Sequence, residues 1–277
     1  MEEVVTYNNF KTNTLSEICR SAIRNMAIAA LAMNQNAAYK NNSIQFPYYH
    51  HVFKDEIKGF ERQIKYFKNC GDFISINDVL QMVESKSKIS GKYFCMSFDD
   101  GFYNCYSNMM PIVVKYNVPV IIYLPTKYVG LKLNNGEEAN EILNFHPNNP
   151  KAISFLDWDN CIEMQKEKII SFGSHTCGHK NLSKLTKQEI EFELQMSKQI
   201  IEEKLGNNCI HFACPWGRLG VDFDENITTA LAQKIGYKTF TTTNRGTTDA
   251  DSNLYTLKRD HLLANWSNYQ LKYFFGK

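Results

Sequence analysis

The feature that most constrains this chain is the alternation of short apolar runs with segments of helical periodicity. From Ile44 onward each strand-like run is followed by a stretch whose apolar residues recur at helical spacing. The runs are IQFPYYHHV, FISI, KYFCMSF, VPVIIYL, IISFGSH, CIHFACPW and YKTFTTT. Strands that alternate with helices in this way form a parallel sheet, either open or closed into a barrel. In such folds the chemistry lies at the carboxyl ends of the strands.

The helix expected over 187–205 has the clearest boundaries. Thr186 and Glu189 form a capping box at its start, and Gly206 follows its end. Further helices are expected near 55–69, 77–85, 104–116, 157–167 and 224–235, and in the aromatic C-terminal segment after LYTLKRDHLL.

The first 42 residues are expected to be an extension of the main domain. Residues 15–33 read as an alanine-rich helix, and 34–42 as a polar linker. We therefore divide the chain into an N-terminal helical extension, 1–42, and a (β/α) domain, 43–277. An oligomer contact or a lid is the natural role for the extension, so a homo-oligomer is among the expected assemblies.

Charge and motif content exclude several classes of function. Lysine and arginine (31) nearly balance aspartate and glutamate (29), and the net charge of +2 gives no electrostatic case for a nucleic-acid or anionic-membrane partner. No GxGxxG or GxxxxGK[ST] motif is present, which argues against a doubly wound nucleotide-binding protein.

The N-terminal segment and the cysteines predict a cytoplasmic protein. The eight cysteines include no CxxC pair and several lie in apolar runs, which suits buried thiols in a reducing compartment. The start MEEVVTYNN lacks the positive charge of a secretory signal, and the apolar stretch 26–33 is too short to cross a bilayer. We expect no integral membrane segment.

The first polar cluster is SFDDG, residues 97–101, at the end of the run KYFCMSF. The adjacent carboxylates of Asp99 and Asp100 repel one another unless a cation or a shared proton lies between them. Gly101 can provide the sharp turn that this position needs. A plain turn or helix cap is the alternative, since Asp and Gly are favoured there.

The second cluster is SHTCGH, residues 174–179, at the end of IISFGSH. If it opens a helical turn, the i,i+4 spacing places His175 and His179 on one face, within reach of one metal ion. Alternatively, one of the two only caps or packs. One carboxylate and two neutral imidazoles would leave coordination positions open, as in a catalytic zinc site. The spare aspartate could then take a proton from water, whose pKa a metal lowers from about 15.7 to about 7.

These motifs stand in an order that resembles the polysaccharide deacetylase family, the NodB-homology or carbohydrate esterase family-four fold. The resemblance covers roughly residue 44 to the C-terminus and is similar to the FAYPYG-type subgroup. The matching segments are YYHHV, FISINDVL, FDDG, MMPIVVKYNVPVIIYLP, FLDWDNCIEM, GSHTCGHKNLSKLT and FACPWG. The fold that this resemblance implies is α/β, a distorted (β/α) barrel of about seven parallel strands.

The resemblance also implies roles for individual residues. Carried over by position, Asp99 is the catalytic base, and Asp100, His175 and His179 bind one divalent metal ion. Zinc is the expected metal, with cobalt, nickel and iron as alternatives. Backbone N–H groups near Pro215 and Trp216 would hold the oxyanion in the CPWG turn. Without the family order, FACPWG would be an ordinary buried strand and turn.

Two positions depart from the family pattern. Cys214 stands where many members have an arginine before proline, so Arg259 is the candidate to orient Asp99, with an exposed solvated arginine as the alternative. The late histidine that acts as general acid has no clean match. His261 by position and His50 by geometry are the candidates, although each could be a packed or surface histidine.

Aromatic residues near strand ends could stack on a sugar ring, with Trp216 as the first choice. Trp158, Tyr123 and Phe102 are further candidates, but most aromatic residues are core residues and Trp158 could simply pack.

The leading hypothesis is a metal-dependent hydrolase that removes an N-acetyl group from an amino sugar. Because no secretory signal is evident, we expect a nucleotide-linked or lipid-linked sugar of surface glycan biosynthesis rather than a secreted polymer. A deformylase or another amidase on the same fold is one alternative. A catalytically silent member that binds a glycan or a partner is another, because a fold does not guarantee an activity.

Overall fold

The apolar runs form parallel strands in this computed structural model, which describes residues 6–10, 15–34, 42–86, 88–131 and 154–276. The main sheet has seven strands in the order β10-β2-β5-β6-β7-β8-β9, and all neighbours pair in parallel. Its strands are β2 (Pro47–Tyr49), β5 (Met96–Phe98), β6 (Val120–Leu124), β7 (Ile170–Ser174), β8 (His211–Ala213), β9 (Thr239–Thr241) and β10 (Asp260–His261). The edge strand β9 approaches the segment that leads into the other edge strand, β10, where Thr241 bridges Leu257. The predicted distorted α/β barrel is confirmed.

A second sheet of three strands completes the β structure of the described residues. It contains β1 (Ser43–Gln45), β4 (Lys92–Phe94) and β3 (Asp72–Phe73), in the order β1-β4-β3. The runs IQFPYYHHV and KYFCMSF were each predicted as one strand, and this was wrong. Each run breaks at the end of a three-residue strand, at Phe46 and at Cys95, and continues in the main sheet. Pro47 lacks a backbone N–H and is therefore tolerated as the first residue of β2.

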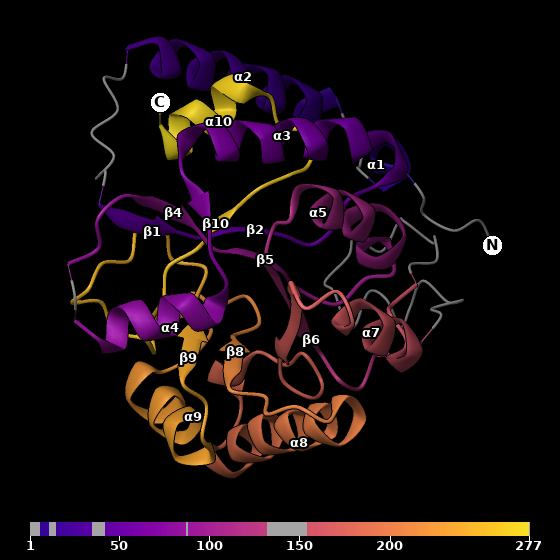
Figure 1. Ribbon diagram of the computed structural model, residues 1–277, viewed down its shortest axis with the longest axis vertical. Helices are drawn as coiled ribbons and strands as arrows, with labels where there is room; N and C mark the ends of the chain where they lie inside the picture. The colour runs from indigo at the N-terminus through magenta and orange to yellow at the C-terminus, as the bar shows by residue number, and fades with distance from the viewer. Residues whose placement is uncertain (1–5, 11–14, 35–41, 87, 132–153, 277) are drawn as a thin grey trace.

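Helices surround the strands (Figure 1). They are α1 (Tyr7–Phe10), α2 (Leu15–Asn34), α3 (Ile57–Cys70), α4 (Ile76–Glu84), α5 (Met110–Tyr116), α7 (Trp158–Gln165), α8 (Lys187–Leu205), α9 (Ala230–Ile235) and α10 (Asn268–Phe275). Shorter helical turns are η1 (Lys54–Glu56), η2 (Cys105–Met109), η3 (Leu182–Lys184) and η4 (Glu225–Thr229).

Helix α8 has the predicted boundaries, and its caps explain why. The Thr186 side chain accepts a hydrogen bond from the Glu189 N–H, and the Glu189 carboxylate accepts one from the Thr186 N–H at 2.8 Å. Gly206 ends the helix in a left-handed conformation, φ +71°. Helix α2 covers the helix predicted over 15–33 and lies beside α10, where Gln270 donates to Asn25 at 3.2 Å (Figure 1). The linker predicted over 34–42 lies mostly outside the described residues, and the domain division at 42/43 stays a prediction.

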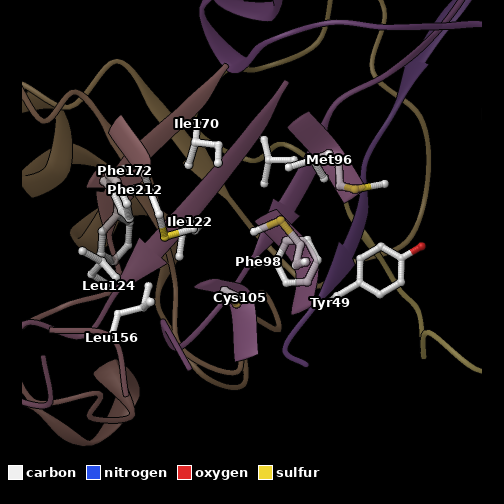
Figure 2. Close-up of a cluster of buried hydrophobic side chains, with 14 of the residues drawn as sticks. Tyr49, Met96, Phe98, Cys105, Ile122, Leu124, Leu156, Ile170, Phe172 and Phe212 are labelled. Carbon is white, nitrogen blue, oxygen red and sulfur yellow. The ribbon is translucent and has the colours of Figure 1, made fainter. Parts of the chain in front are cut away.

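The core fills both faces of the main sheet. Alternate residues of β6 point to opposite sides, since Ile122 and Leu124 belong to one buried cluster and Ile121 and Tyr123 to another. Figure 2 shows the first cluster, to which successive strands contribute Phe98, Ile122, Leu124, Phe172 and Phe212. Burial on both faces is typical of a parallel sheet covered by helices.

All eight cysteines are free thiols, and five of them are buried. Among the described residues, no helix has the length and apolar character needed to span a membrane.

Candidate active site

Polar residues follow the carboxyl ends of neighbouring strands and meet in one cavity of about 360 Å³. Asp99 and Asp100 follow β5, and His175 follows β7. His50 follows β2, and His261 is the last residue of β10. All five line the cavity, together with His179. The strand order brings them together, because β2 and β10 are adjacent and only β6 separates β5 from β7.

Asp100, His175 and His179 form a buried cluster whose potential ligand atoms all lie within 4.8 Å of one another. Oδ1 of Asp100 lies 3.1 Å from Nε2 of His179 and 3.5 Å from Nε2 of His175. In the described part of the chain, this oxygen is buried and, apart from its close approach to the His179 ring, has no hydrogen-bond partner. A buried carboxylate oxygen without a donor is costly unless a cation satisfies it.

The chemistry of these three side chains fits a divalent metal ion. Nδ1 of His175 lies 2.7 Å from the carbonyl oxygen of Ala213, which leaves Nε2 to face Asp100. Burial lowers the pKa of His175 to about 4, so its imidazole is neutral at pH 7, as a metal ligand must be. Burial alone would raise the pKa of Asp100, but the neighbouring His179 outweighs it and holds that pKa below its usual range. The protein therefore offers an Asp/His/His site, and this donor set does not select one metal.

The loop after β7 brings the two histidines together without the helical turn that was considered for SHTCGH. Residues 175–180 form a bent loop, in which Thr176 (φ +64°) and His179 (φ +51°) have left-handed conformations. The DDG turn is similar, with φ +68° at Asp100 and +61° at Gly101. Left-handed backbone in residues other than glycine is strained and is concentrated at functional sites.

Asp99 is held by a buried arginine. Arg259 donates two hydrogen bonds to its carboxylate, at 2.6 and 2.8 Å, and a third to the Thr242 carbonyl at 3.0 Å. Arg259 is completely buried, which excludes the exposed, solvated alternative. Burial alone would raise the pKa of Asp99, but the Arg259 guanidinium outweighs it and holds that pKa below its usual value. Asp99 is therefore ionised at neutral pH with a fixed orientation.

His50 and His261 form a pair at the cavity wall. Nδ1 of His50 lies 3.1 Å from Nε2 of His261, and Nε2 of His50 lies 3.9 Å from Oδ2 of Asp100. The protein around His261 and the neighbouring His50 lower the pKa of His261 to about 3, so its ring is neutral in the free protein. The two candidate proton donors are thus neighbours rather than alternatives at distant positions.

The CPWG segment forms a tight turn after β8. Trp216 (φ +54°) lines the cavity, and its ring centroid lies 4.8 Å from that of His179. The Pro215 carbonyl accepts the Gly217 N–H, and the Trp216 carbonyl accepts the Thr243 hydroxyl. The structure does not bring Trp158 into the cavity. That side chain is half-buried at the start of α7 and packs against the core.

Comparison with known proteins places these motifs in a family. A family model described as "Polysaccharide deacetylase" matches residues 86–240, which include Asp99, Asp100 and both histidines of the cluster. This chain belongs to the polysaccharide deacetylase family. Membership of the FAYPYG-type subgroup stays a prediction.

Curated relatives within the polysaccharide deacetylase family are distant. YxkH of Bacillus subtilis is 26% identical over 203 residues, covering 73% of this chain but only 63% of its own length. The poly-β-1,6-N-acetyl-D-glucosamine N-deacetylase of Staphylococcus aureus is 25% identical over 268 residues, covering 88% of this chain and 85% of the relative.

Solved structures share the deacetylase fold. IcaB from Ammonifex degensii has a TM-score of 0.68 at 18% identity, over 81% of this chain and 93% of that one. Streptococcus pyogenes deacetylase PplD, in complex with acetate, has a TM-score of 0.65 at 23% identity, over 84% of this chain and 96% of that one.

Sequence reasoning missed part of the cavity wall that lies outside the deacetylase family match. Tyr7, Phe10, His51, Phe53 and Glu56 all line the cavity. His51 lies within the YYHHV motif and Phe53 follows it, which was a usable signal, whereas nothing in the sequence connects α1 with the site. Glu56 is only 3% exposed, and burial raises its pKa to about 7.

Proposed function

We propose that this protein is a metal-dependent hydrolase that removes an N-acetyl group from an amino sugar. One observation carries the proposal: an ionised aspartate, held by a buried arginine, lines the same cavity as an Asp/His/His cluster suited to a metal. Family membership supports amide hydrolysis in particular.

In this mechanism Asp100, His175 and His179 would hold the metal ion. When bound, a divalent cation supplies Lewis-acid polarisation of the amide carbonyl and of water. Asp99 accepts the proton of the attacking water, because its ionised carboxylate has no competing proton at neutral pH. Arg259 fixes the direction of that carboxylate.

The remaining steps need a hydrogen-bond donor that stabilises the oxyanion and an acid that protonates the leaving amine. The backbone N–H of Trp216, in the turn beside His179, is the candidate donor to the developing oxyanion. His261 is the candidate donor to the leaving amine, with His50 as its hydrogen-bonded partner. Because His261 is neutral in the free protein, it must gain a proton before it donates one to the amine, and in the overall balance the proton that Asp99 takes from the water supplies it.

The substrate is proposed as an N-acetylated amino sugar. The relative named for poly-β-1,6-N-acetyl-D-glucosamine supports a glycan substrate, while the sequence alone favours a nucleotide-linked or lipid-linked sugar. A formyl group in place of acetyl is the enzymatic alternative. The cytoplasmic location and the homo-oligomer stay predictions.

The test is metal analysis combined with acyl release. Purified protein, reloaded with zinc, would be assayed for acetate and formate from N-acylated sugar nucleotides and from β-1,6-linked N-acetylglucosamine oligosaccharides. We expect about one metal ion per chain, as in other three-ligand catalytic sites. His175→Ala and Asp100→Asn should lose both metal and activity. Asp99→Asn should keep the metal while kcat falls by about 10²- to 10⁴-fold.

A surface carboxylate provides the control. Asp159→Asn changes an exposed aspartate of α7 and should leave metal content and kcat unchanged. Stoichiometric metal without acyl release from any substrate would favour the silent, glycan-binding alternative. Wild-type protein that binds no metal would eliminate the proposed site.

A further inference from the structure

The loop that carries two of the candidate metal ligands, residues 175–180, is bound from behind by helix α8. The Gly178 N–H donates to Oε2 of Glu193 at 2.6 Å, and the preceding Cys177 N–H donates to the Glu193 carbonyl at 3.2 Å. A Cβ added to Gly178 would lie 3.1 Å from Oε1 of Glu193, so glycine leaves room for this close approach. One residue of α8 therefore accepts two consecutive N–H groups of the loop between His175 and His179.

Glu193 places an acidic side chain inside the protein. The residue is only 3% exposed, and its Oε1 lies 3.5 Å from Nζ of Lys180. The Lys180 side chain is largely exposed, so water screens its charge and this ion pair contributes little. Removal of a carboxyl group from water costs free energy unless hydrogen bonds compensate for the lost hydration. The bond from the Gly178 N–H is therefore the main compensation among the described contacts of this side chain.

Hydrogen bonds on the other sides of the loop complete its restraint. The Tyr128 hydroxyl donates to the Gly178 carbonyl at 3.1 Å, and the His179 N–H donates to Oγ1 of Thr176 at 2.9 Å. The peptide groups on both sides of Gly178 are thus fixed. Left-handed conformations such as those of Thr176 and His179 persist only where the surrounding structure enforces them. The direction of the His179 ring, whose Nε2 lies 3.1 Å from Oδ1 of Asp100, depends on this backbone.

We propose that Glu193 is a positioning residue for the candidate metal site: its carboxyl group holds the loop so that His179 faces Asp100 and His175 before a metal ion binds. This proposal rests on the proposed function and deepens it, because it names what keeps a ligand in place. Glu193 does not line the cavity and is not a member of the Asp/His/His cluster. It acts through the loop backbone, so its loss should weaken metal binding without weakening substrate binding.

Zinc titration of the full-length protein after chelator treatment, with a chromophoric chelator as competitor, tests this role. Glu193→Leu deprives the Gly178 N–H of its acceptor, so the zinc dissociation constant should rise by between about tenfold and 100-fold, as for other residues that orient metal ligands. Glu193→Asp shortens the side chain by one methylene group and should also weaken zinc binding. Glu193→Gln keeps an oxygen that can accept the same bond at the same distance, and should recover most of the lost affinity.

Activity at saturating zinc gives a second readout. KM for a β-1,6-linked N-acetylglucosamine oligosaccharide should be unchanged in all three variants, because Glu193 lies outside the cavity. Thermal unfolding of the zinc-free variants would show that the fold is kept. A side chain that only stabilises the fold would change this unfolding temperature without ranking Gln above Asp in zinc affinity.

Glu202 provides the matched control on the same helix. Its Oε1 accepts the Cys209 N–H at 2.9 Å, which is the same chemistry, but Cys209 belongs to the segment before β8 and not to the metal-binding loop. Glu202→Leu should therefore leave the zinc dissociation constant unchanged.

The positioning role would be overturned by wild-type zinc affinity in Glu193→Leu, by a loss in Glu193→Gln as large as that in Glu193→Leu, or by an equal loss in Glu202→Leu. Wild-type protein that binds no zinc would overturn the metal site of the proposed function as well. A wild type that binds zinc and releases acetate, with Glu193 variants that bind zinc equally well, would overturn the positioning role alone.

Discussion

The pairing of Asp99 with Arg259 joins residues 160 positions apart in the sequence. Both side chains are almost completely removed from water, so each charge needs the other. A buried ion pair of this kind adds little stability compared with an apolar pair, but removal of one partner leaves an uncompensated buried charge. The pair is therefore retained for what it does to Asp99: it fixes the carboxylate and keeps it ionised.

Replacement of Arg259 should therefore destabilise the protein and inactivate it. We expect Arg259→Met to lower the free energy of unfolding by about 3–5 kcal/mol, because the Asp99 carboxylate loses its buried counter-charge. Urea denaturation monitored by circular dichroism measures this change, and acetate release measures the activity.

The matched control is the double variant Asp99→Asn/Arg259→Met, which removes both charges. It should recover most of the lost stability while remaining inactive. If the double variant were as unstable as Arg259→Met, the cost would come from lost packing rather than from the unpaired carboxylate.

At the scale of elements, local signals predicted the helices better than the strands. The capping box and the terminal glycine specify α8 from a few neighbouring residues, and the structure confirms both ends. The breaks at Phe46 and Cys95 were not predictable, because two short parallel sheets side by side require the same apolar residues as one longer strand. The aspartates and histidines were found from sequence because Asp99 and His175 directly follow strands, and Asp100 and His179 belong to the same short polar motifs.

The path of the loops after these strands was not predictable. A helical turn explains i,i+4 histidines equally well, yet the segment 175–179 instead uses left-handed backbone at Thr176 and His179. The contribution of α1 was also missed, because its contacts with the cavity residues His51 and Phe53 join positions more than 40 residues apart.

The DDG turn after β5 depends on Gly101. This residue has φ +61°, and a Cβ added there would lie 2.6 Å from the Leu124 side chain. Gly101→Ala should therefore lower the free energy of unfolding by about 1–3 kcal/mol and weaken metal binding, because the strained turn would displace Asp100. Thermal unfolding and zinc titration measure the two effects.

Gly206→Ala is the control for Gly101→Ala, because it has the backbone strain of a left-handed position without the clash with the Leu124 side chain. Gly206 ends α8 with a similar φ of +71°, and a Cβ there would meet nothing within 4 Å. This variant should lower the free energy of unfolding by about 1 kcal/mol and leave zinc affinity unchanged. Equal effects of the two substitutions on zinc affinity would argue that Gly101 does not position Asp100.

At the scale of the whole molecule, the candidate metal cluster connects parts of the chain that follow different strands of the sheet. Asp100 follows β5, while His175 and His179 follow β7, with β6 between them. A metal ion bound by all three would favour the folded chain, because the unfolded chain does not hold them in one place. Stability should thus depend on metal as well as on core packing.

Metal removal should lower the unfolding temperature only of protein in which the cluster of Asp100, His175 and His179 is intact. At a free zinc concentration about 100-fold above its dissociation constant, binding to the folded state adds about 2.7 kcal/mol to the free energy of unfolding. Calorimetric scans of zinc-loaded and chelator-treated protein at pH 7 should therefore show a higher unfolding temperature with zinc. His175→Ala should unfold at one temperature with or without zinc, whereas Asp99→Asn should still respond, since Asp99 is paired with Arg259 and is not part of the cluster. A zinc response that persists in His175→Ala would place the bound ion elsewhere in the chain, and loss of the response in Asp99→Asn would make that aspartate a ligand rather than the base.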